Sequence, residues 1–145
     1  MALVKATPAL VIRYSYLWRR EHLLGQEEGL KDRPCAVVMM VQDKDGRDIV
    51  TVLPVTHSPP QTPGDAIEIP ADTKRRLGLD DARSWVVLTE ANRFVWPGPD
   101  LRPGVNGDPS SIAYGSLPER LFERIRLGFL AKAKAQAVPL VTRTE

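Results

Sequence analysis

The sequence contains only one cysteine and two histidines among its 145 residues. One cysteine cannot form an intramolecular disulfide, and no Cys/His set of the kind that binds structural zinc is present. Cys35 lies inside an apolar stretch, so we expect it to be a small buried side chain. The composition therefore predicts no disulfide framework, no metal site and no cofactor.

Long apolar runs are missing too. No segment approaches the roughly 20 apolar residues that a membrane-spanning helix needs. Residues 1–12 are partly apolar, but Pro8 interrupts them and Arg13 ends them, which makes the run too short for a signal peptide. We therefore expect a cytoplasmic protein that has no membrane association.

The chain has little net charge, because 20 Lys and Arg stand against 18 Asp and Glu and leave +2. The total charge alone does not indicate a nucleic-acid-binding protein. A local basic patch is what phosphate binding requires, and the basic residues do cluster. The clusters are Arg13, Arg19 and Arg20; Lys31 and Arg33; and Lys74, Arg75 and Arg76. Ordinary solvated surface charge is the alternative for each cluster.

Sequence motifs of several common enzyme classes do not occur. The chain has no Gly-rich nucleotide-binding loop, no Gly-x-Ser-x-Gly elbow and no His-Glu-x-x-His. Nucleotide-driven, serine-hydrolase and zinc-protease functions therefore have no support in the sequence.

Two apolar runs rich in β-branched residues predict an antiparallel hairpin. The runs are residues 33–41 and 48–56, and the segment between them contains the turn former Asp45-Gly46. Antiparallel pairing brings the start of the first strand beside the end of the second. We therefore expect Arg33 and Thr56 to meet at one rim of the sheet and to form an anion or phosphate site.

The rest of the chain favours a single mainly β (α+β) domain over residues 1–145. A capping box, Ser116-Leu117-Pro118-Glu119, predicts a helix over about 117–137, whose apolar stripe would pack on the sheet. Alternating residues predict a half-buried strand over 10–16. Further expected elements are strands over 66–69, 85–88 and 93–96, a short helix over 70–77 ended by Gly78, a mobile loop over 17–32 and an irregular stretch over 97–109.

Two short motifs carry a family resemblance. They are Arg33-Pro34-Cys35-Ala36-Val37-Val38 and, further on, Leu53-Pro54-Val55-Thr56. In this order and at this spacing they resemble the PemK/MazF family, the toxins of bacterial type II toxin–antitoxin pairs, and the likeness extends loosely over residues 10–96.

The resemblance implies a small SH3-like β-barrel over about residues 10–114, followed by the C-terminal helix. It also implies a homodimer that cuts single-stranded RNA without a metal and inhibits growth. An acidic antitoxin peptide would be its second partner, bound over the basic groove.

RNA can be cleaved by its own 2′-hydroxyl, and the protein must then bind the phosphate and move protons. Arg33 suits charge stabilisation and Thr56 suits phosphate positioning. The histidines, His57 beside Thr56 and His22 in the expected loop, are the candidates for proton transfer. The alternative for either histidine is a structural or solvated side chain.

The expected loop over 17–32 carries an aromatic residue and several basic ones. Trp18, Arg19 and Arg20 suit base stacking and phosphate contact, and Lys31 adds charge beside the predicted site. A solvated loop with one packing tryptophan is the alternative.

One departure from the family keeps a second function open. Some family members place Arg-x-Asp on a later strand, and the comparable stretch here, residues 87–90, lacks it, although Glu90 could supply a carboxylate. A non-catalytic binding module that kept the barrel and lost the nuclease is therefore the alternative to an endoribonuclease.

Overall fold

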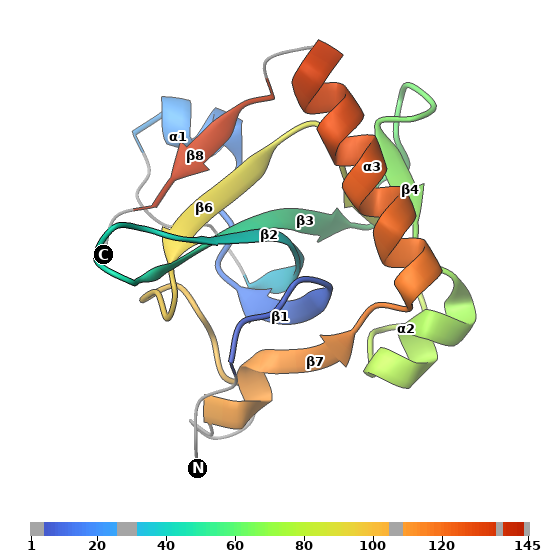
Figure 1. The fold of residues 1–145 in the computed structure, drawn as a ribbon. Helices are drawn as coiled ribbons and strands as arrows, with labels where there is room; N and C mark the ends of the chain where they lie inside the picture. The colour runs from blue at the N-terminus through green and yellow to red at the C-terminus, as the bar shows by residue number, and fades with distance from the viewer. Residues whose placement is uncertain (1–4, 26–31, 105–108, 136–137, 144–145) are drawn as a thin grey trace.

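The computed structural model of the chain describes residues 5–25, 32–104, 109–135 and 138–143. In these residues one mostly antiparallel sheet is accompanied by three α-helices and a short 3-10 helix (Figure 1). The strands are β1 (Leu10–Tyr14), β2 (Arg33–Gln42), β3 (Asp48–Thr56), β4 (Ala66–Glu68), β5 (Trp85–Val87), β6 (Ala91–Val95), β7 (Ala113–Ser116) and β8 (Leu140–Thr142). The helices are α1 (Arg19–Leu23), α2 (Ala71–Leu77), η1 (Pro109–Ile112) and α3 (Glu119–Ala135). The expected mainly β (α+β) class is confirmed.

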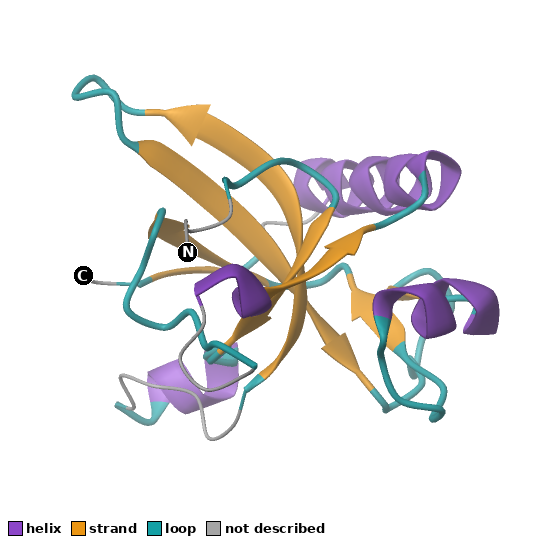
Figure 2. Cartoon of the chain, turned by 90° about the horizontal axis from the view of Figure 1, so that it is seen from below, coloured by secondary structure: helices purple, strands orange, loops and turns teal. Residues whose placement is uncertain are grey.

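The hairpin of β2 and β3 is the centre of the sheet, as the sequence predicts. The strand order is β4-β5-β3-β2-β1-β7, and β6 also pairs with β3, along the half of β3 that β5 leaves free. β8 pairs with β6 in the parallel direction. No pairing joins the two ends of this order, β4 and β7, within the described part of the chain, so the sheet is not closed there. Figure 2 shows its strong twist, with the helices beside it.

Both faces of the central strands are buried, and each face contributes to its own apolar cluster. Leu10, Ile12 and Tyr14 of β1 belong to one cluster. Val11, which lies between Leu10 and Ile12 in the sequence, belongs to the other. The prediction of a half-buried first strand is therefore wrong in one respect. The alternation of faces is correct, but Val11 and Ser15 on the second face are also buried, because α3 and the C-terminal segment cover that side.

The C-terminal helix α3 packs against the second cluster. Its predicted stripe of Leu121, Ile125 and Phe129 is buried, as expected for an amphipathic helix on a sheet. Gly128 allows the close approach, because a Cβ atom there would lie 2.8 Å from Cδ1 of Leu88. No helix in the described residues has both the length and the apolar character needed to cross a membrane.

Three short elements differ from the sequence expectations. Residues 19–23 of the expected loop form α1, which begins where the Trp18 N–H donates to the Glu21 carboxylate and the Arg19 N–H donates to Glu90. Strands β7 and β8 were not expected. Each has four residues or fewer, so neither shows an alternation that a sequence pattern could reveal. The short helix over 70–77 is confirmed as α2, with Gly78 in the left-handed conformation at its end.

A buried polar network ties the last described residues to the sheet. The Arg143 guanidinium, 3% exposed, lies 2.9 Å from the Asp100 carboxylate and donates to the Ser15 carbonyl at 2.8 Å. It also donates to Oδ1 of Asn92 at 3.1 Å, and the Asn92 amide in turn exchanges two hydrogen bonds with the backbone of Leu17. The network joins Arg143, which directly follows β8, to the 97–104 segment and to the residues that follow β1.

We predict that Asp100→Ala lowers the free energy of unfolding by about 3 kcal/mol, because it leaves the buried Arg143 charge without its carboxylate. Urea denaturation followed by circular dichroism measures this loss. The matched control is Asp72→Ala, whose 89% exposed side chain pairs with Arg75 at the surface and should change stability by less than about 0.5 kcal/mol. Equal effects of the two substitutions would contradict the prediction.

Candidate functional site

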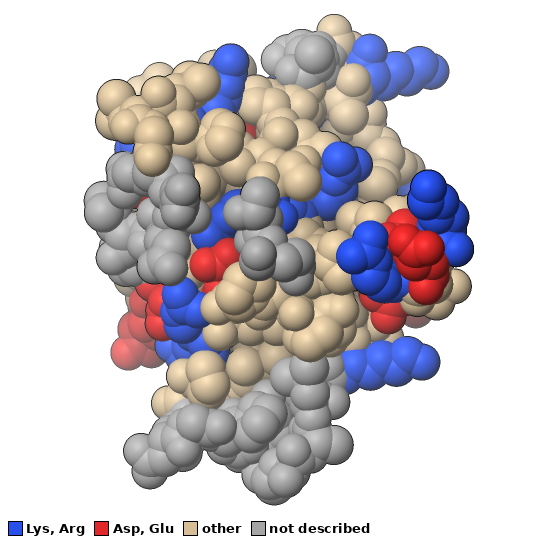
Figure 3. Space-filling view, turned by 90° about the vertical axis from the view of Figure 1, so that its left-hand side faces the viewer, with Lys and Arg blue, Asp and Glu red and all other residues tan. Residues whose placement is uncertain are grey.

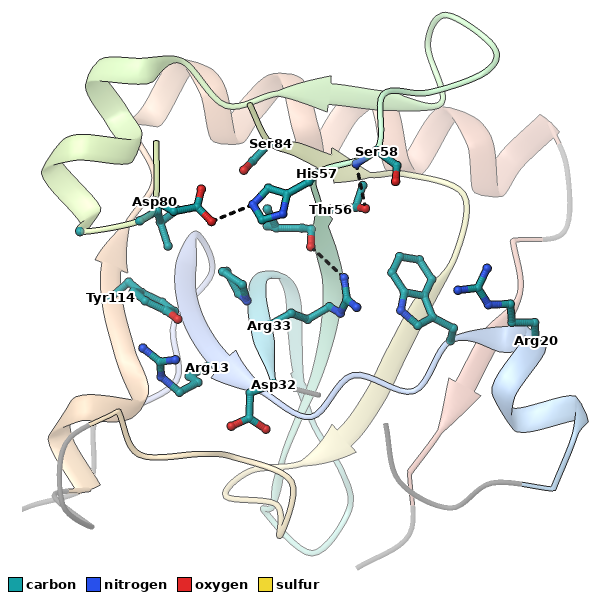
Figure 4. Close-up of a pocket in the computed structure, with 15 residues that line it drawn as sticks. Arg13, Arg20, Asp32, Arg33, Thr56, His57, Ser58, Asp80, Ser84 and Tyr114 are labelled. Atoms are coloured by element: carbon teal, nitrogen blue, oxygen red, sulfur yellow. Dashed lines mark hydrogen bonds and ion pairs between the residues drawn. The ribbon is translucent and has the colours of Figure 1, made fainter. Parts of the chain in front are cut away.

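A pocket of about 520 Å³ opens at the rim of the sheet where β2 begins and β3 ends. Arg33 and Thr56 both line it, so the expected meeting of these two residues is confirmed (Figure 4). The cause is the hairpin register, in which Cys35 pairs with Pro54 and leaves the ends of the two strands side by side. An Nη of Arg33 donates to the Val55 carbonyl at 3.4 Å, a long hydrogen bond.

Arg33 has no carboxylate partner within the described part of the chain. Its guanidinium carbon lies 4.9 Å from the ring centroid of Trp18, and its Nε is buried without a hydrogen-bond partner among the described residues. A buried polar hydrogen without an acceptor costs about 1–3 kcal/mol. Such a cost is retained most readily where a ligand offsets it, and an arginine on an aromatic face with free donors suits an anionic ligand.

Arg13 is a second pocket residue of the same kind, which the sequence analysis placed in a basic cluster but not in the site. Its guanidinium carbon lies 4.9 Å from the ring centroid of Tyr114, and its Nε is also buried without a hydrogen-bond partner in the part of the chain that the structure describes. Arg13 is paired with Pro34, and Tyr14 with Arg33, so strand alternation alone puts the two arginines on opposite faces. No sequence signal indicated that both would face one pocket.

His57 is held in the pocket by a carboxylate. Its Nε2 lies 2.8 Å from Oδ2 of Asp80, which follows α2, and both side chains are more than half exposed. An ionised carboxylate only accepts hydrogen bonds, so Nε2 is the donor and the neutral ring presents Nδ1 as an acceptor. Sequence reasoning missed Asp80, because 23 residues separate it from His57 and no motif connects them.

A buried lysine holds Asp80 in turn. Lys74, whose side chain is 5% exposed, lies 2.7 Å from Oδ1 of Asp80. It also donates to Oγ of Ser84 at 2.7 Å and to the Ala82 carbonyl. The hydrogen bond from Lys74, with a further contribution from His57, lowers the pKa of Asp80 below its ordinary value. Asp80 is therefore a fixed, ionised acceptor at neutral pH.

Positive charge exceeds negative charge at the pocket wall. Asp32 is 3.6 Å from Arg102, and Asp80 is engaged by Lys74, so both acidic residues that line the pocket have other cationic partners. This excess of positive charge is confined to the pocket wall. Figure 3 shows Lys and Arg on one face in separate groups, with acidic side chains beside some of them, and not as one continuous basic surface.

Trp18 joins this pocket to a neighbouring hollow of about 330 Å³. Arg20 lies 5.9 Å from the Trp18 ring and lines both hollows, and Pro59 and Pro60 form an apolar wall of the second. Trp18, directly before α1, and Arg20, in the first turn of α1, thus line the same pocket as Arg33, as expected for residues that would contact RNA.

Other candidate residues lie elsewhere. His22 is exposed on α1 and lines neither hollow, and the same is true of Arg19, whose N–H binds Glu90. Glu90 also accepts the Tyr16 hydroxyl at 3.1 Å, so the suggested substitute carboxylate anchors α1 instead of the pocket. Lys31 lies outside the described residues.

The single cysteine lies inside β2. Cys35 is fully buried, as expected, and burial raises the pKa of its thiol far above its ordinary value. It is therefore not a nucleophile at neutral pH. No group of three His, Cys, Asp or Glu side chains close enough to share a metal ion occurs in the described ranges.

No protein-family model matches the chain, and no curated protein matches it. The resemblance to the PemK/MazF family therefore rests on the two short motifs.

We predict that Lys74→Met raises the pKa of Asp80 back toward its ordinary value, because the substitution removes the hydrogen bond from Lys74, the main cause of the lowered pKa. Since the folded-state pKa of Asp80 is depressed, the Lys74 contact stabilises the fold above about pH 4. This contribution is lost as the pH falls through the folded-state pKa.

Carbon-13 NMR titration of the aspartate carboxyl groups measures the change. Lys132→Met is the control, because Lys132 pairs with Asp65 and should leave the Asp80 titration unaltered. An Asp80 pKa that is the same in the wild type and in Lys74→Met would contradict the prediction.

Proposed function

We propose that this chain is a metal-independent endoribonuclease that cleaves single-stranded RNA and acts in the cytoplasm as the growth-inhibiting toxin of a type II toxin–antitoxin pair. The observation that carries the proposal is the Arg33 guanidinium, without a carboxylate partner in the described residues, in one pocket with Thr56 and an imidazole held by a carboxylate. On this proposal the sheet is a form of the small SH3-like barrel of the PemK/MazF family.

The reaction uses the 2′-hydroxyl of the RNA as nucleophile on the adjacent phosphorus. The bond from phosphorus to the 5′-oxygen breaks and that oxygen takes a proton from solvent, which leaves a 2′,3′-cyclic phosphate and a 5′-hydroxyl. Negative charge grows on the phosphoryl oxygens in the transition state, and the fixed charge of Arg33 stabilises it. Arg33 does not carry the proton, because the pKa of a guanidinium lies above about 12.

His57 takes the proton of the attacking hydroxyl. With its Nε2–H donated to Asp80, the neutral ring offers Nδ1 as a general base. Asp80 orients the ring and stabilises the imidazolium that forms, as carboxylates do in other histidine–carboxylate pairs. Thr56 positions the phosphate: its Oγ1 accepts the Ser58 N–H at 3.2 Å, which leaves the hydroxyl hydrogen for a phosphoryl oxygen.

The surface around the pocket also binds a neighbouring nucleotide and the antitoxin. A base of the strand stacks against Trp18 in the second hollow, with Arg20 beside it. An acidic antitoxin peptide inhibits the enzyme by neutralising the arginines of the pocket, and the chain acts as a homodimer, as the family resemblance implies.

A non-catalytic binding module is the second candidate. It is favoured by the position of Glu90, which is engaged by Tyr16 and Arg19 and does not supply the pocket with the carboxylate that the missing Arg-x-Asp would have given. Such a module keeps the cationic pocket and leaves RNA intact.

We predict that the purified protein cleaves mixed-sequence single-stranded RNA in EDTA and leaves 2′,3′-cyclic phosphate ends. Arg33→Ala should reduce the rate at least about 100-fold, because it removes the charge that stabilises the transition state. Gel analysis of end-labelled RNA and mass spectrometry of the termini measure rate and product.

Arg126→Ala is the charge-matched control, because Arg126 pairs with Glu123 on α3, away from the pocket. This variant should cleave RNA at the wild-type rate. Intact RNA with folded wild-type protein would leave the binding module as the function. Cleavage by Arg33→Ala at the wild-type rate would remove Arg33 from the mechanism.

We predict that His57→Gln lowers the cleavage rate by about 100-fold or more, because general-base catalysis contributes at least this factor. His22→Gln should stay within about twofold of the wild type, since His22 lies outside the pocket. Single-turnover rates at several pH values separate proton transfer from binding. Loss of activity in His22→Gln with activity retained in His57→Gln would reverse the assignment.

A further inference from the structure

Two buried side-chain nitrogens lack a hydrogen-bond partner in the described part of the chain, and both belong to arginines that line the same pocket. They are the Nε atoms of Arg13 and Arg33. Native structures leave few buried polar atoms unsatisfied, and each such atom calls for an explanation. The proposed nuclease accounts for Arg33 but assigns no task to Arg13.

The two arginines occupy separate places in the pocket. Arg13 lies on the ring of Tyr114, a residue of β7, whereas Arg33 lies on the ring of Trp18. Figure 4 places Arg13 with Tyr114 to one side of Arg33, and Arg20 on the other side. Each guanidinium lies against the ring of its aromatic partner, and an arginine that stacks in this way can still bind phosphate oxygens through its fork.

The surroundings of Arg13 do not satisfy its charge. The nearby carboxylate of Asp32 is 3.6 Å from Arg102, and no carboxylate of the described residues forms an ion pair with Arg13. The absence of a side chain at Gly104 makes room for the guanidinium, because a Cβ atom there would lie 3.0 Å from its Nε. Burial raises the pKa of Tyr114, so its hydroxyl stays protonated and able to donate.

We propose that Arg13, supported by Tyr114, forms a second phosphate subsite, which holds a phosphate next to the scissile one on the same RNA strand. The inference rests on the proposed function, in which Arg33 holds the scissile phosphate. Two guanidinium groups at separate positions match the repeated charge of a polynucleotide backbone better than a single phosphate. The subsite fixes the position of the strand, so that the 2′-hydroxyl at Arg33 lies beside His57.

Binding of small ligands that cannot be cleaved tests the subsite independently of nuclease activity. The probes are 2′-deoxynucleoside 3′,5′-bisphosphates of all four bases, compared with the matching 3′- and 5′-monophosphates, in EDTA by titration calorimetry. The wild type should bind the bisphosphates about tenfold more tightly than either monophosphate, because a second charge-assisted contact forms.

Arg13→Ala should abolish this preference: bisphosphate affinity falls about tenfold and monophosphate affinity, which Arg33 retains, changes less than about twofold. Arg13→Lys keeps the charge without the bidentate fork and should give an intermediate preference, and it serves also if the alanine variant does not fold. Arg126→Ala, which removes an arginine on α3, should bind like the wild type.

Equal wild-type affinity for bisphosphates and monophosphates would overturn the subsite. So would an Arg13→Ala variant that retains the bisphosphate preference or weakens all probes equally. The binding test is independent of the nuclease test, because the deoxynucleotide probes lack the 2′-hydroxyl and cannot be cleaved. If the protein prefers bisphosphates but leaves RNA intact, only the cleavage proposal fails. If the protein cleaves RNA but shows no preference for bisphosphates, only the subsite proposal fails.

Discussion

The antiparallel pairing of β2 with β3 is the constraint on which the other elements depend. β1 and then β7 extend the sheet from β2, while β5 and β6 share the opposite edge of β3. The same pairing brings the first residue of β2, Arg33, to the last residue of β3, Thr56. The site is thus a direct product of hairpin register, and a shift by one residue would turn the side chains of a strand to the other face.

The cationic side chains of the molecule have two different kinds of surroundings. Arg143 is fully engaged by Asp100 and by backbone and side-chain oxygens, and Lys74 by Asp80 and Ser84, which is how a buried cation stabilises a fold. Arg33 at the pocket lacks a carboxylate in the described residues and keeps a buried, unsatisfied nitrogen. The contrast separates structural cations from cations that are available to an anionic ligand, and it supports an anion-binding role for the pocket.

Most of the fold was predictable because its main signals are local. Apolar runs and an Asp-Gly turn specify the hairpin, and a glycine ends α2 at residue 78. α1, β7 and β8 were missed because their stability comes from distant partners: Glu90 accepts the Arg19 N–H at the start of α1, and β8 joins β6 from about 50 residues away. In the candidate site, Arg33, Thr56, His57, Trp18 and Arg20 were named from the sequence and line the pocket, whereas Asp80 and Arg13 were not assigned to it.

The sequence by itself determined the hairpin, the amphipathic C-terminal helix and the meeting of Arg33 with Thr56, because strand pairing and helix periodicity depend on neighbouring residues. Only the tertiary structure decided which carboxylate reaches His57, that His22 lies away from the pocket and that Arg13 faces it. These outcomes depend on how α2, β1 and β7 converge on one rim. Such convergence comes from packing between residues far apart in the chain, for which a single sequence carries no local signal.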